Sequence, residues 1–179
     1  KLLYHEDNIS SLTVIKSFAS VCRALLKINE SRIGLIGKPS DWLLHSNDVR
    51  SLNKFTTEII KIDTEAIKKI VRELDNSQID PELQLLNSYK HTLSQNSIND
   101  SLKVYIALKQ IASSNRLDAF TVRCFDLLEY EYTACMGMSI CNDEDMVAGC
   151  EGDIHALFSM MIGSYITEKP CWMANPSTI

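Results

Sequence analysis

Short apolar runs alternate with helical segments along this chain, and this alternation limits the available folds more than any other feature. Four runs have the length and composition of buried strands, at residues 32–37, 55–62, 119–125 and 146–150. Helical connections bring a chain back to the same edge of a sheet, so neighbouring strands should be parallel. The sequence therefore predicts an α/β fold, with an open, mostly parallel sheet and helices on both faces, of the Rossmann or flavodoxin-like type.

A chain of 179 residues can bury the core of one full domain. We expect residues 1–179 to be a single α/β domain within a longer protein. Residues 1–30 are predicted to form an N-terminal packing helix, residues 31–75 a first strand–helix–strand–helix unit, and Trp172–Ala174 a fifth strand. The apolar residues expected to form one buried stripe on the first helix are Leu12, Ile15, Phe18, Ala19, Cys22, Leu25 and Leu26.

Charge and cysteine content exclude several classes of function. The 18 Lys and Arg residues are scattered and outnumbered by 23 Asp and Glu residues, which argues against nucleic-acid binding. Every strongly apolar stretch ends before the roughly 20 residues that a membrane span needs. The six cysteines form no Cys-x-x-Cys pair and lie in apolar surroundings. We therefore expect a soluble cytoplasmic protein with buried free thiols and no membrane partner.

Polar residues follow three of the predicted strands, at Gly37–Trp42, Phe125–Asp126 and Cys150–Asp153. In an open parallel sheet, ligands bind outside the carboxyl ends of the strands. If the last two strands are neighbours, Asp126 and Glu151 converge, and their repulsion raises a pKa unless a cation lies between them. Carboxylate oxygens select hard cations such as Mg²⁺ or Mn²⁺. The residues alone leave a metal site and a pair of structural helix caps as alternatives.

Other residues at these strand ends also have two possible roles. Asp153 is expected to cap the helix that follows it, and His155 to be a solvated or wall residue rather than a ligand. In the first loop, either Ser40 or Asp41 caps the next helix, or the loop lines a substrate. In the second case Trp42 offers a flat apolar face that suits a sugar ring, and Ser40 and His45 offer hydrogen bonds. This loop lacks the glycine spacing of a nucleotide-binding turn.

The ends of the last two strands carry a recognisable signature. Phe125–Asp126, the run Cys150–Leu157 (CEGDIHAL) and Met160–Met161 resemble the L-fucose/L-arabinose isomerase family. The resemblance covers mainly residues 118–179, and Arg32–Ser40 resembles the opening strand of the family's middle domain. It implies a domain of a metal-dependent aldose–ketose isomerase that acts on a small sugar and forms a homo-oligomer.

The family's chemistry implies roles for individual residues. Mn²⁺ or another divalent cation would be held by Asp126 and Glu151, with Asp153 as the other acid that could fill the second position, and with a histidine from beyond this chain. Asp126 or Glu151 would be the general base of an ene-diol route. The residues assigned to substrate binding are Ser40, Trp42 and His155.

Two other functions are compatible with the same fold, because a fold does not determine a function. The main alternative is a non-catalytic sugar-binding or sensing domain related to these isomerases. The other is a flavodoxin-like module that binds a nucleotide or flavin, for which Lys38–Ser40 offers a poor phosphate cradle.

Overall fold

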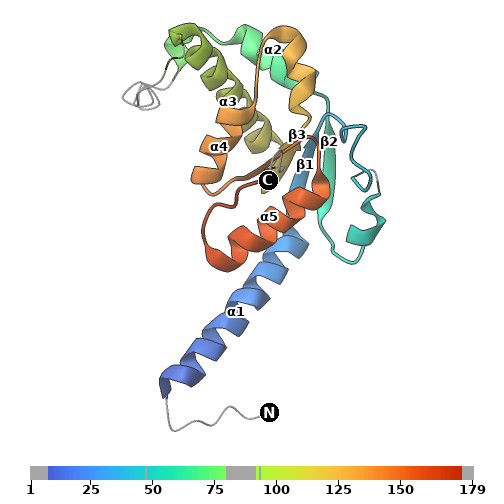
Figure 1. Cartoon of the computed structure of the whole chain (residues 1–179), viewed down its shortest axis with the longest axis vertical. Helices are drawn as coiled ribbons and strands as arrows, with labels where there is room; N and C mark the ends of the chain where they lie inside the picture. The colour runs from blue at the N-terminus through green and yellow to red at the C-terminus, as the bar shows by residue number, and fades with distance from the viewer. Residues whose placement is uncertain (1–7, 47, 80–91, 93, 175–179) are drawn as a thin grey trace.

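Four parallel strands form a sheet in the order β2-β1-β3-β4 (Figure 1). They are seen in a computed structural model that describes residues 8–46, 48–79, 92 and 94–174. The strands are β1 (Arg32–Ile36), β2 (Glu58–Ile62), β3 (Ala119–Val122) and β4 (Val147–Cys150). This confirms the predicted α/β fold with a parallel sheet.

Helices cover both faces of the sheet (Figure 1). The helices α2 (Glu65–Glu73), α3 (Gln95–Asn115) and α4 (Cys135–Asp143) pack on the face that carries Phe120 and Val122. The opposite face is covered by α5 (Ile154–Thr167) and by the end of α1 (Asn8–Glu30). All four positions of β3 are buried, which explains why the central strands are continuously apolar in sequence rather than alternating.

The connection from β1 to β2 differs from the expected strand–helix–strand–helix unit at residues 31–75. Its described residues contain a short 3-10 helix, η1 (Val49–Leu52), and no α-helix. Thr56 and Thr57 donate side-chain hydrogen bonds to the last carbonyl groups of α1, so β2 begins only at Glu58. Long-range contacts of this kind override the β-branched pattern at the start of the segment.

The chain also departs from the sequence prediction at two further places. β3 ends at Val122, because the 3-10 helix η4 (Cys124–Tyr130) begins directly after it. Trp172–Ala174 forms no strand, and the side chain of Trp172 is 88% exposed. The prediction of a fifth strand is therefore wrong.

The first helix forms as predicted, but its apolar stripe is mostly exposed. Phe18 is 70% exposed and Leu26 is 64% exposed, whereas Ala24 and Ile28 are buried in the core beneath α5. Figure 1 shows α1 extending beyond the sheet, with only its last turns against the domain. A periodic pattern shows which residues share a helix face, and it does not show what covers that face. Within the described residues, no helix has the length and apolar character of a membrane span.

Two phenylalanine substitutions test this description of the core. Phe120→Ala should lower the free energy of unfolding by about 3–5 kcal/mol, because Phe120 is fully buried under α3. Phe18→Ala makes the same chemical change at an exposed site and should alter stability by no more than about 0.5 kcal/mol. Urea unfolding followed by circular dichroism measures both values, and equal losses would contradict the burial described here.

Candidate functional site

Three turns meet at the carboxyl edge of the sheet, after β1, β3 and β4. The backbone N–H of Ser40, in the loop after β1, donates to the carbonyl oxygen of Glu151 after β4 at 2.9 Å. The N–H of Gly152 donates to the carbonyl oxygen of Val122 in β3 at 3.2 Å. The loop after β1 therefore crosses the end of β3 and rests on the turn after β4. The crossing lies where the strand order reverses, which is the place where open α/β sheets bind ligands.

Gly152 allows the two turns to approach each other. Its φ is +67°, and a Cβ atom at this position would lie 2.5 Å from the carbonyl oxygen of Lys38. Glu151 also has a positive φ, of +63°. A non-glycine residue in this left-handed region is uncommon and costs free energy. The turn therefore places the Glu151 side chain by means of a strained backbone.

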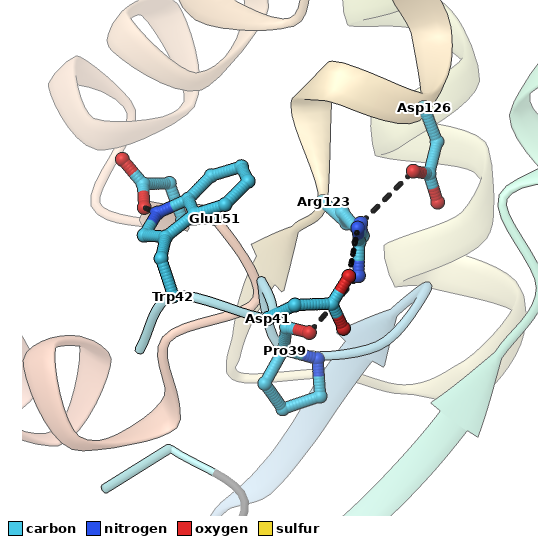
Figure 2. A network of polar contacts seen from close by, with 6 residues as sticks. All are labelled: Pro39, Asp41, Trp42, Arg123, Asp126 and Glu151. Carbon is cyan, nitrogen blue, oxygen red and sulfur yellow. Dashed lines mark hydrogen bonds and ion pairs between the residues drawn. The ribbon is translucent and has the colours of Figure 1, made fainter. Parts of the chain in front are cut away.

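Trp42 covers the carboxylate of Glu151. The indole N–H donates to Oε2 of Glu151 at 2.7 Å (Figure 2). Glu151 is 9% exposed, whereas Trp42 is 56% exposed. The ring of Phe125 meets the ring of Trp42 edge-on, with 5.3 Å between the centroids. The result is a buried carboxylate whose orientation is set by an exposed aromatic side chain.

Arg123 is a nearly buried cation that connects the turns at this edge of the sheet. Its guanidinium donates to the carbonyl oxygen of Pro39 at 3.1 Å and to Oδ2 of Asp41 at 3.2 Å, and its Nε lies 2.9 Å from Oδ1 of Asp126 (Figure 2). The arginine side chain is only 11% exposed. Its hydrogen bond and charge hold the pKa of Asp41 below the usual value. Arg123 thus joins the turns after β1 and β3.

The structure gives Asp126 and Glu151 different partners. Asp126 faces Arg123 and Glu151 faces Trp42, and Figure 2 shows the guanidinium lying between Asp41 and Asp126 while Glu151 lies behind the indole. Asp153 caps α5, since its Oδ1 accepts a hydrogen bond from the N–H of Ala156 at 3.0 Å. In the described part of the chain, no three His, Cys, Asp or Glu side chains form a group that could hold a metal ion. These residues alone do not fit a complete metal centre, and the Mn²⁺ site stays a prediction.

The other residues predicted to bind substrate are in different surroundings. Ser40 is fully buried, and its hydroxyl group has no hydrogen-bond partner among the described residues, so it does not line an open surface. His155 is half-buried in the first turn of α5. It lies near Asp48, whose pKa is lowered mainly by hydrogen bonds from Arg50 and to a smaller extent by His155. Trp42 contacts one of the predicted catalytic carboxylates, that of Glu151.

Sequence reasoning missed Arg123 and a pair of thiols. Arg123 is a charged residue inside an apolar run, which is the signal that could have identified it. Cys124 and Cys150 are free, half-buried thiols whose sulfur atoms lie 2.9 Å apart. The hydrogen bond between these sulfurs lowers the pKa of Cys124 and raises the pKa of Cys150. The expectation of buried thiols holds for Cys141, whereas Cys135 is exposed.

Comparison with known proteins points to sugar isomerases. The chain is 23% identical over 152 residues to a sulfoquinovose isomerase of Alkalicoccus urumqiensis, covering 82% of this chain and 34% of that protein. It is 26% identical over 152 residues to the sulfoquinovose isomerase of Priestia megaterium, covering 80% of this chain and 33% of that protein. The chain spans about a third of the length of these curated relatives. No family model matches it.

The matched names confirm the expected resemblance only at the level of sugar isomerases. They do not bear on metal dependence or on the L-fucose/L-arabinose family in particular.

Substitution of Gly152 tests the approach of the two turns. Gly152→Ala should lower the free energy of unfolding by about 2–4 kcal/mol, because it adds left-handed strain and a clash with the backbone of Lys38. Gly149→Ala is the matched control, since its Cβ would meet Leu157 only at ordinary contact distances of 3.4 Å or more. Its cost should be about 1 kcal/mol or less. Equal effects in urea unfolding would show that the loop after β1 does not rest on Gly152.

Titration of Asp41 tests the ion pair with Arg123. Carboxyl carbon NMR should give Asp41 a pKa below its usual value of 3.8, and Arg123→Gln should return this pKa towards that value. Because the pKa is lowered in the folded state, the stabilisation is present above about pH 4 and is lost as the pH falls through the lowered pKa.

Asp75 is the internal control for this titration, because its pKa is lowered mainly by the backbone N–H of Ser77 and should not respond to Arg123→Gln. If the pKa of Asp41 were the same in Arg123→Gln as in the wild type, the pairing with Arg123 would be contradicted.

Proposed function

We propose that this chain is the α/β domain of an aldose–ketose isomerase and that the sugar binds at the carboxyl edge of its sheet, against Trp42. The observation that carries the proposal is the buried carboxylate of Glu151, held at 2.7 Å by the exposed indole of Trp42. The similarity to proteins named sulfoquinovose isomerase supports this class of reaction. The proposal concerns the whole protein, of which this chain supplies one part of the site.

The proposed reaction moves protons between neighbouring carbon and oxygen atoms of an open-chain sugar. A base removes the proton from C2 while O1 gains a proton, giving an ene-diol. The hydroxyl group at O2 then loses its proton and C1 gains one, so that an aldose becomes a ketose of the same formula. No oxidant and no covalent intermediate are needed. The protein must supply a well-placed base and hold the sugar in the reactive geometry.

Glu151 is better placed than Asp126 to be this base. Asp126 is ion-paired with Arg123, so protonation of Asp126 would weaken that pair. Glu151 accepts from a neutral indole N–H, which orients the carboxylate without neutralising its charge. Glu151 is also nearly buried, which limits its contact with water. We therefore assign the role of general base to Glu151 and a structural role to Asp126.

Trp42 would be the binding surface for the sugar. Its ring is more than half exposed and is supported from one side by Phe125. An aromatic side chain offers an apolar face next to a polar group, which suits the C–H groups and hydroxyl groups of a sugar. Binding at this ring would bring the sugar close to Glu151.

The expected metal has a smaller place in this proposal. Asp126 is paired with Arg123, Glu151 is bonded to Trp42, and Asp153 caps the N-terminus of α5. Mn²⁺ or another divalent cation would therefore need further ligands from outside the described residues. We derive no step of the reaction from a metal. The homo-oligomer expected from the resemblance also stays a prediction.

A non-catalytic sugar-binding or sensing domain is the second candidate. The ion pair of Asp126 with Arg123 favours it, because this pair removes one of the two predicted catalytic carboxylates from the reaction. Such a domain would bind the sugar against Trp42 and release it unchanged.

An isomerisation assay separates the two candidates. The longer protein that contains this chain should convert at least one of the aldoses sulfoquinovose, L-fucose and L-arabinose to its ketose. The assay is run with added Mn²⁺ and again after removal of divalent metal by a chelator. Glu151→Gln should lower kcat by roughly 100-fold or more, since it removes the base and keeps the side-chain shape. Glu73→Gln is the control, because Glu73 is exposed at the end of α2 and should leave the rate unchanged. Sugar binding by calorimetry without any turnover would support the sensing domain instead.

Variants of Trp42 test the orientation of Glu151 separately from sugar binding. Trp42→Phe keeps an aromatic face and removes the N–H donor, so kcat should fall with little change in KM. Trp42→Ala removes the face as well and should also raise KM. Equal KM values in both variants would show that the ring does not bind the sugar.

A further inference from the structure

Two thiols lie side by side at the ends of the neighbouring strands β3 and β4. Cys150 is the last residue of β4, and Cys124 opens η4, two residues beyond the partner of Cys150 in β3, Val122. Their Sγ atoms are 2.9 Å apart, and both cysteines are free. A disulfide bond is about 2.05 Å long, so the sulfur atoms need to approach by only about 0.9 Å.

We propose that Cys124 and Cys150 are a redox-active pair that is oxidised by a peroxide to a reversible disulfide. The proposal goes beyond sugar isomerisation and does not depend on it.

The surroundings of the pair favour this reaction over oxidation elsewhere. Cys150 is held in place by the pairing of β4 with β3 and by Thr121, whose hydroxyl group donates a hydrogen bond to the carbonyl oxygen of Cys150 at 3.0 Å, and Cys124 follows β3 at the start of η4. Both thiols are half-buried. Cys150 also lines a cavity of about 440 Å³, which gives a small oxidant a route to the sulfur.

The reaction balances with one molecule of hydrogen peroxide. The first thiol attacks the peroxide, which gives a sulfenic acid and one water. The second thiol then displaces the hydroxyl group of the sulfenic acid as a second water, and the S–S bond forms. Two hydrogen atoms leave the protein in total, and the peroxide is reduced to two waters. A dithiol reductant reverses the bond by thiol–disulfide exchange.

Cys135 is the main competitor for either partner. It is the exposed thiol of this segment, and it lines the same cavity as Cys150. The structure places no hydrogen bond between Cys135 and either sulfur of the pair within the described residues. The proposal therefore predicts that Cys135 is reached by alkylating reagents and is not joined to Cys124 or Cys150.

The disulfide must be located by cleavage after glutamate. Trypsin would leave all these cysteines in one peptide, because no Lys or Arg lies between Cys124 and Lys169. Cleavage after glutamate separates Cys124, the pair Cys135 and Cys141, and Cys150 into different peptides. The cleavage sites in this segment are Glu129, Glu131, Glu144 and Glu151.

The test is oxidation of the full chain with a few equivalents of hydrogen peroxide, followed by mass spectrometry of the unreduced digest. We expect a cross-linked pair of peptides that contain Cys124 and Cys150, with the loss of two hydrogen atoms, and its disappearance after dithiothreitol. Cys135→Ser should form the same cross-link, and Cys124→Ser should lose it. Differential alkylation of the wild-type chain gives the same answer without relying on the folding of a variant. A cross-link to Cys135, or only oxygen added to single thiols, would overturn the proposal.

Discussion

The close contact between the loop after β1 and the turn after β4 organises the carboxyl edge of this sheet. It depends on the missing side chain at Gly152, where a Cβ atom would lie 2.5 Å from the carbonyl oxygen of Lys38. With this contact in place, the loop crosses the end of β3, and Trp42 comes to lie on Glu151. One aromatic side chain and one carboxylate thereby lie together at the edge where open parallel sheets bind ligands.

Arg123 is a second organising residue at this edge of the sheet. Acidic side chains repel one another when they lie close together, and the guanidinium of Arg123 contacts two of those at this edge, Asp41 and Asp126. The carboxylate of Glu151 accepts a hydrogen bond from a neutral donor, the indole N–H of Trp42. Arg123 thus contacts Asp41 and Asp126, whereas the proposed general base, Glu151, contacts Trp42.

Most of the sheet could be predicted from sequence, because β1, β3 and β4 are short, mainly apolar runs, which is typical of strands covered on both faces. The connection after β1 could not, since its path is set by hydrogen bonds to residues about 80 to 110 positions away, such as Arg123 and Glu151. The sequence also placed Asp126 and Glu151 at one edge of the sheet without showing where they face. Their directions depend on Arg123 and Trp42, and on the left-handed backbone of residue 151.

The left-handed conformation of Glu151 has a consequence for how this protein can change. At φ +63° a glycine would suit the backbone better than any residue with a side chain. Glu151→Gly would therefore relax the main chain while deleting the carboxylate. Selection for thermal stability alone should favour Glu151→Gly, whereas selection for sugar turnover should reject it. Stability and the proposed catalytic role thus place opposite demands on residue 151.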